Sequence, residues 1–139
     1  MSTFTEYFAG ECSISLENVT YNKLKENDGD VTLKVKDSIE IKEKQNDVNS
    51  LEFIVSRSLT FDPKSLAEIN VSFGVVLELN DQLKNSEQLD YARLRDEIIS
   101  EDSVLMSIIM SRISMLISQL TSSYGERPIV TPPSFLKDA

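Results

Sequence analysis

The sequence contains no histidine, a single cysteine and only four glycines among its 139 residues. Without histidine, and with Cys12 alone, the chain has no conventional Cys/His zinc set and cannot form an internal disulfide. It also has no glycine-rich phosphate loop and no Gly-x-Ser-x-Gly elbow. We therefore expect no metal, no cofactor and no enzymatic activity.

Positive charge is also scarce, because 14 Lys and Arg face 23 Asp and Glu and leave a formal net charge of −9. A surface that binds nucleic acid needs clustered Lys and Arg to neutralise phosphates, so we expect no nucleic-acid partner. The first residues, "MSTFTEYFAGECSISL", lack the basic and continuous apolar regions of a secretory signal, which predicts a cytoplasmic protein. The length is that of one ordinary domain, and we expect residues 1–139 to form it.

Three segments alternate apolar and polar residues with the period of two that is typical of a half-buried strand. They cover residues 31–43, 51–61 and 69–79. The polar "KQNDVNS" joins the first two as a hairpin, and Asp62–Pro63 marks a turn after the second. An earlier segment, 12–24, changes phase near Asn18, which predicts a bulge or crossover. The chain therefore offers four strands, mostly antiparallel.

Two charges interrupt the apolar rows of the hairpin strands, Asp37 in the first and Arg57 in the second. If the hairpin pairs Glu43 with Leu51, Asp37 lies directly opposite Arg57. We predict that they pair, because an unpaired charge on a covered face is costly and a matched one is tolerated. The alternative is that the centre of the sheet is solvated there.

The pattern changes to helical spacing after Asn80. "NSEQLDYARLRDEIISED" predicts a first helix with Ser86 as its N-cap. The apolar stretch "LMSIIMSRISMLISQLTSSYG", residues 105–125, predicts a long second helix. Ser100, Glu101, Asp102 and Ser103 cap its start, and it stops at Gly125.

The long helix could instead span a membrane, since its apolar length approaches the roughly 20 residues that a bilayer requires. Arg112 at its centre, the acidic flank and the amphipathic strands argue against an integral membrane protein. A helix that is apolar nearly all round must be covered on two sides in a soluble protein. We expect the sheet to cover one side and another copy of the chain the other, packed along a line of serines.

The order of these parts resembles the SecB family of preprotein-export chaperones. The resemblance is carried by "VSFGVVLEL" at 71–79, the long helix, Gly125, Pro128 and "TPPSF" at 131–135. It implies an α+β fold, with a four-stranded antiparallel sheet and two helices on one face. It also implies a homotetramer, a dimer of dimers in which the long helices lie between the sheets.

The resemblance further implies an ATP-independent holdase for unfolded polypeptides, which in the export version passes its clients to the SecA motor. The resemblance leads us to expect an acidic residue just before "VSFGVVLEL", the run with an aromatic residue followed by a small one. This position is Asn70 here, which argues against SecA as a partner. Members of the family also protect antitoxins. An oligomeric adaptor, or an antitoxin-specific chaperone with one dedicated protein partner, is therefore the alternative function.

Six residues are candidates for binding a client peptide. In the family, the groove involves the crossover after the first strand and the adjoining edge strand, which here carry Tyr21, Leu24, Val31 and Leu33. Flexible methionines suit a promiscuous surface, and the long helix contributes Met106 and Met110. Ordinary packing is the alternative role for Tyr21, Leu24 and both methionines.

Overall fold

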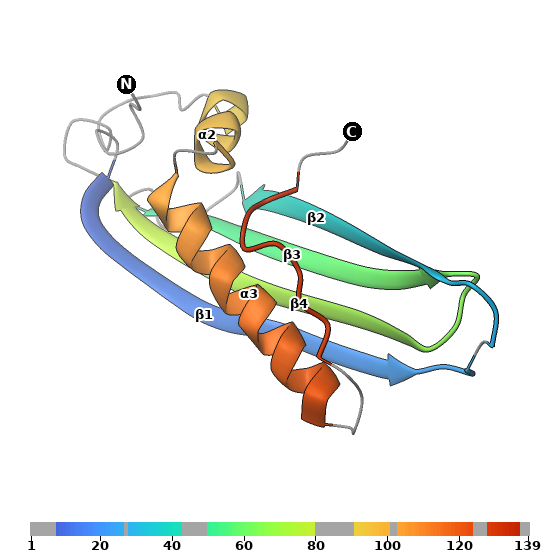
Figure 1. Cartoon of the computed structure of the whole chain (residues 1–139). Helices are drawn as coiled ribbons and strands as arrows, with labels where there is room; N and C mark the ends of the chain where they lie inside the picture. The colour runs from blue at the N-terminus through green and yellow to red at the C-terminus, as the bar shows by residue number, and fades with distance from the viewer. Residues whose placement is uncertain are drawn as a thin grey trace.

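The fold is a four-stranded antiparallel sheet with helices packed on one face (Figure 1). This computed structural model describes residues 8–26, 28–42, 50–79, 91–100, 103–123 and 128–136. Its elements are β1 (Phe8–Lys23), β2 (Thr32–Lys42), β3 (Ser50–Asp62), β4 (Ala67–Leu79), α2 (Tyr91–Ile98) and α3 (Val104–Ser123). The predicted α+β class, with its four strands and two helices, is confirmed.

The strands lie in the order β1-β4-β3-β2, so the longest strand occupies one edge and β2 the other. The chain must cross the end of the sheet between β1 and β2. Two backbone hydrogen bonds hold the start of this crossover, from Leu24 N to the Leu66 carbonyl (2.9 Å) and from Leu66 N to the Lys25 carbonyl (2.8 Å). Leu66 adopts a φ of 63°, which a side chain disfavours and which these bonds maintain. It follows a cis Asp62–Pro63 peptide bond.

The register of β1 changes in its middle, as its sequence phase predicts. A bulge lies between Leu16 and Asn18, so the side chains that face the helices shift from even positions to odd ones, beginning with Val19. Glu17 at the bulge lies over Gly74 of β4, where a Cβ atom would displace the Glu17 side chain. Gly74, the small residue after the aromatic Phe73, therefore leaves room for the bulge in β1.

The core lies between the sheet and α3. Alternate residues of β3 and β4 are buried on this face because their side chains point toward the helices. The helix contributes Met106, Ile109, Met110, Ile113 and Ile117, none of them more than 2% exposed. Ser103 is the N-cap, since its hydroxyl accepts a hydrogen bond from Met106 N (3.2 Å), which confirms part of the predicted cap.

Helix α2 covers Tyr91–Ile98, within the segment where the sequence predicts the first helix, and the predicted N-cap, Ser86, lies outside the described residues. Its last residue, Ile98, is fully buried in the same core as α3. Burial of this anchor attaches α2 to the sheet next to β2.

By length and composition, residues 104–122 of α3 could cross a membrane, and 33% of this stretch is buried within the chain. One side of the helix packs on the sheet. The opposite side exposes Val104 (73%), Ile108 (42%) and Met115 (61%). We call this side, with Val104, Ile108 and Met115, the outer face of α3. Its exposed apolar side chains are the reason to expect that something besides the sheet packs against the helix.

Shortening a buried side chain of α3 should destabilise the fold. We expect Ile113→Ala to lower the free energy of unfolding by about 2–5 kcal/mol, because it leaves a cavity in the core. Urea denaturation followed by circular dichroism measures this change. Ser111→Ala, at an exposed position on the same helix, is the matched control and should stay within about 0.5 kcal/mol of the parent chain.

Candidate functional site

The centre of the site is a buried ion pair between β2 and β3. Asp37 pairs with Arg57 in the hairpin register, and both side chains are 0% exposed. Arg57 donates from Nε to Asp37 Oδ1 and from Nη2 to Asp37 Oδ2, each at 2.7 Å. The predicted pair is confirmed, and the solvated alternative is wrong. Two parallel hydrogen bonds make this the strongest geometry available to an arginine and a carboxylate.

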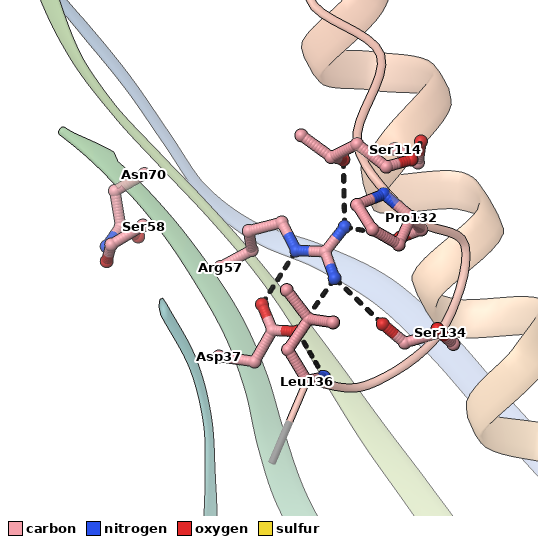
Figure 2. A network of polar contacts seen from close by, with 9 residues as sticks. Asp37, Arg57, Ser58, Asn70, Ser114, Pro132, Ser134 and Leu136 are labelled. Carbon is pink, nitrogen blue, oxygen red and sulfur yellow. Dashed lines mark hydrogen bonds and ion pairs between the residues drawn. The ribbon is translucent and has the colours of Figure 1, made fainter. Parts of the chain in front are cut away.

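A segment that follows α3 completes this pair (Figure 2). Residues 128–136, here called the strap, lie across the sheet beside α3 (Figure 1). Arg57 Nη1 donates to Thr131 Oγ1 (2.8 Å) and to the Pro132 carbonyl (2.6 Å), while Nη2 donates to the Ser134 carbonyl (2.9 Å). In return, Leu136 N donates to Asp37 Oδ2 (2.8 Å).

All five N–H donors of the Arg57 guanidinium therefore have an acceptor. Two of the acceptors are backbone carbonyls of the strap. We call Asp37 and Arg57 together the clamp, since they hold the strap through backbone groups and the single hydroxyl of Thr131.

Helix α3 holds the strap from its other side. Ser114 Oγ donates to the Thr131 carbonyl (2.6 Å), and Ile129 N donates to Thr121 Oγ1 (2.8 Å). Ser114 belongs to the line of serines that we expected to face another copy of the chain. That part of the line instead faces the strap. The sequence contains "TPPSF", but no local signal there indicates Arg57 as its partner.

Four of the six candidate residues lie at the same end of the sheet, where β1 ends and β2 begins, on the two edge strands and the crossover between them. Tyr21 lies opposite Ile69, and Leu33 lies opposite Phe61, all on the face that carries the helices. Leu24 and Val31 flank the crossover at the same end. Figure 1 shows that this end extends beyond α3.

We call this region the open end of the sheet, defined by Tyr21, Leu24, Val31, Leu33 and Phe61. Leu33 is 36% exposed, and the other four are half-buried. An apolar surface is therefore partly accessible at this end of the sheet, beside the crossover.

The two methionines do not lie at the open end. Met106 is 2% exposed and Met110 is 0% exposed, both packed in the core between α3 and the sheet. Their burial favours the packing role that the sequence left as an alternative. Met115, to which the argument for flexible methionines also applies but which is not among the six candidates, is the methionine that α3 exposes.

A cavity of about 220 Å³ opens beside the strap at the start of α3. Its lining combines apolar side chains with serine hydroxyls: Ile99, Ser100, Ser103, Met106, Ser107, Pro133, Ser134 and Phe135. The cavity therefore adjoins the same part of the strap whose carbonyl groups the clamp holds.

The opposite face of the sheet carries a polar cluster around Asn70. Asn70 Nδ2 donates to Ser58 Oγ (2.8 Å), and its Oδ1 accepts from Ser72 Oγ (3.2 Å). Ser72 Oγ also lies 2.8 Å from Ser56 Oγ. At the position where the resemblance leads us to expect an acid, an uncharged amide is thus fixed by its neighbours.

Groups suited to covalent or metal chemistry do not gather in the described part of the chain. Burial raises the pKa of the Cys12 thiol, against the opposing effect of the Arg112 charge, so less thiolate forms at neutral pH. Within the described residues, no three His, Cys, Asp or Glu side chains are arranged to hold a metal ion.

The fold is similar to that of one SecB-like chaperone, Rv1957 of Mycobacterium tuberculosis, solved in complex with a ChAD peptide from the Rv1956 HigA1 antitoxin. The TM-score is 0.63 at 10% sequence identity, over 86% of this chain and 85% of that one.

A protein of unknown function from Streptococcus agalactiae matches with a TM-score of 0.46 at 8% identity, over 88% of this chain and 97% of that chain. No family model matches the sequence, and no curated protein does. The likeness to Rv1957 therefore rests on the fold.

Breaking the clamp should be far more costly than breaking an exposed ion pair of the same hairpin. We expect Asp37→Leu and Arg57→Leu each to lower the free energy of unfolding by about 3–5 kcal/mol, because each leaves a buried charge without its partner. The double variant should lose less than the sum of the two. Urea denaturation of all three variants measures the coupling.

Asp62→Asn is the control for this experiment. It removes the Lys34–Asp62 ion pair (3.4 Å), whose side chains are 62% and 64% exposed. Its cost should stay below about 1 kcal/mol. Single clamp variants that unfold at the same urea concentration as this control would contradict the assigned role of the clamp.

Proposed function

We propose that the protein is an ATP-independent holdase that binds unfolded polypeptides at the open end of the sheet. The observation that carries this proposal is the partial exposure of five apolar residues at the open end: Tyr21, Leu24, Val31, Leu33 and Phe61. Such a surface takes apolar side chains of many sequences, because hydrophobic contacts are not directional. The shared fold with a SecB-like chaperone supports the same conclusion. We assign this activity to the cytoplasm.

The neighbouring edge strand adds a second means of binding. β2 is an edge strand of the described sheet, and Leu33 is near its start. An extended client can add to such an edge through its backbone while its side chains contact the apolar residues of the open end. Backbone pairing together with hydrophobic contact gives affinity without selecting a sequence, which a holdase needs.

A second candidate function is that of a chaperone dedicated to one protein partner, such as an antitoxin. The structural neighbour was solved with an antitoxin peptide bound, which favours this alternative. The Asn70 cluster favours it over delivery to SecA, because an amide held by Ser58 and Ser72 replaces the expected acid. The two candidates differ in the number of unrelated clients that they protect.

We further propose that the outer face of α3 packs against other copies of the chain in a homotetramer. Val104, Ile108 and Met115 recur at spacings that place them on one side of the helix. Exposed apolar side chains of this size are unfavourable in water, and a symmetric assembly buries all copies at once. The small Ser111 between them permits close approach of a second helix.

The holdase proposal is tested by the aggregation of several unrelated denatured proteins, diluted into buffer without ATP. We expect a stoichiometric amount of the chain to suppress light scattering for each client. Leu33→Ser should weaken this suppression several-fold, because it removes an accessible apolar contact. Val76→Ser is the matched control, since Val76 is similarly exposed (40%) but lies on the opposite face.

The result also decides between the two candidates. Protection of every client, with loss only in Leu33→Ser, supports the holdase. Protection of a single partner protein favours the dedicated chaperone. An equal loss in Leu33→Ser and Val76→Ser would remove the open end from either function, and absence of any suppression would refute the holdase.

Charges placed on the outer face of α3 should dissociate the assembly. We expect the double variant Ile108→Asp, Met115→Asp to show a lower native mass than the parent chain, because buried carboxylates would repel one another. Thr32→Asp, Ser38→Asp is the matched control, with the same change of charge at exposed positions of β2. Native mass spectrometry measures both. A parent chain that is monomeric would contradict the proposed tetramer.

A further inference from the structure

We infer that the clamp is a second polypeptide-binding site that binds backbone groups, and that the strap occupies it until a segment of an unfolded client takes its place. This inference rests on the proposed function. It assigns to Asp37 and Arg57 a role in client binding as well as in stability. It assigns to the strap, residues 128–136, the role of competing with client segments for the clamp.

The strap has no helix or strand of its own and bends at Pro133 and Ser134. It contacts Thr121 near one end of α3 through Ile129, and its Phe135 lines the cavity with Met106 near the other end. The occupant of the clamp is therefore a chain without regular secondary structure, as an unfolded client is.

The clamp recognises groups that every polypeptide possesses. Arg57 holds the carbonyls of Pro132 and Ser134, and Asp37 accepts from the N–H of Leu136. These backbone groups are two residues apart along the strap. Of the strap's side chains, only the Thr131 hydroxyl contributes to the clamp. Any segment that follows the path of the strap can offer the same carbonyl and N–H groups.

Few side chains of the strap are buried. Thr131 is 3% exposed, whereas Pro128, Pro132, Pro133 and Ser134 are exposed and Val130 is 79% exposed. The apolar side chains that replacement of the strap would uncover are Ile129, Phe135 and Leu136, all half-buried. Most of the bonds from the strap to the clamp are made by backbone groups, which a competing backbone can reproduce.

The clamp also tolerates exchange of its occupant. The Asp37–Arg57 pair is bidentate by itself, so neither charge loses its partner when the strap leaves. The three Arg57 N–H groups that the strap satisfies then need acceptors from the arriving segment. The cavity beside Pro133, Ser134 and Phe135 gives an arriving side chain a place next to the strap before exchange is complete. Exchange can thus proceed stepwise.

The test uses the full chain and a fluorescent synthetic peptide with the sequence of residues 128–136, followed by anisotropy. The parent chain should bind it weakly, because the tethered strap competes at a high effective concentration. Thr131→Val removes one hydrogen bond to the Arg57 charge from the strap but not from the peptide. We expect peptide affinity to rise about tenfold. Val130→Ala, at an exposed neighbouring position, should leave it unchanged.

Two altered peptides test whether the backbone is read, with the Thr131→Val chain as receptor. N-methylation of the peptide nitrogen that corresponds to Leu136 removes the donor to Asp37 and should lower affinity at least about fivefold. A peptide with alanine in place of the exposed Val130 should bind as well as the original. Equal affinities for all three peptides would overturn the inference.

Hydrogen exchange on the parent chain gives a measurement that needs no variant. The amide of Leu136 should lose protection when reduced, carboxymethylated α-lactalbumin, which stays unfolded, is added as a client. A parent chain that suppresses client aggregation while this amide stays protected overturns the inference and leaves the holdase intact. A parent chain that suppresses no aggregation overturns both. A Thr131→Val chain that doubles its mass without gaining peptide affinity shows that a second copy's strap takes the clamp, which also overturns the inference.

Discussion

The bidentate ion pair between Asp37 and Arg57 is the interaction on which the rest of the structure depends. Removing two charges from water is costly, and a buried pair is retained only where its remaining donors and acceptors are satisfied. Here the strap satisfies them, through Thr131 and three backbone groups. The pair therefore joins β2, β3 and the strap in one polar network inside an otherwise apolar core. Through Ser114, the same network reaches α3.

This network divides the helix-bearing face of the sheet into regions with different roles. Helix α3 and the strap cover its middle, while the end beyond α3 leaves Leu33 and its neighbours partly accessible. Covered and accessible regions thus lie on one rigid sheet. A client bound at the open end would meet the strap on the same surface. The proposed holdase activity and the proposed exchange at the clamp therefore concern adjacent parts of one face.

Local sequence patterns predicted much of this fold, because strands show themselves in the periodicity of their side chains. The period of two placed β2, β3 and β4, and the change of phase near Asn18 matched the bulge in β1. Hairpin register then brought Asp37 opposite Arg57, since cross-strand neighbours are set by the length of a short loop. Tyr21, Leu24, Val31 and Leu33 were nominated through the resemblance to the SecB family and not through a local pattern.

Other features had no local signal. Met106 and Met110 have the composition of an adaptable surface, yet only packing against the sheet decides that they are buried. The serines of α3 form one line in the sequence pattern, and nothing in that pattern separates one from another. In the structure, Ser114 faces the strap and Ser111 is exposed. Neither distinction can be read from residue types, because small polar side chains serve equally at a solvent face and at a close contact.

The sequence by itself determined the elements, the hairpin register and the charge pair, because each depends on residues close together along the chain or across one turn. Only the tertiary structure decided the strand order β1-β4-β3-β2 and the partner of the strap. Thr131 lies 74 residues from Arg57, and Leu136 lies 99 from Asp37. Contacts at such separations depend on how all the intervening elements pack, which no single segment encodes.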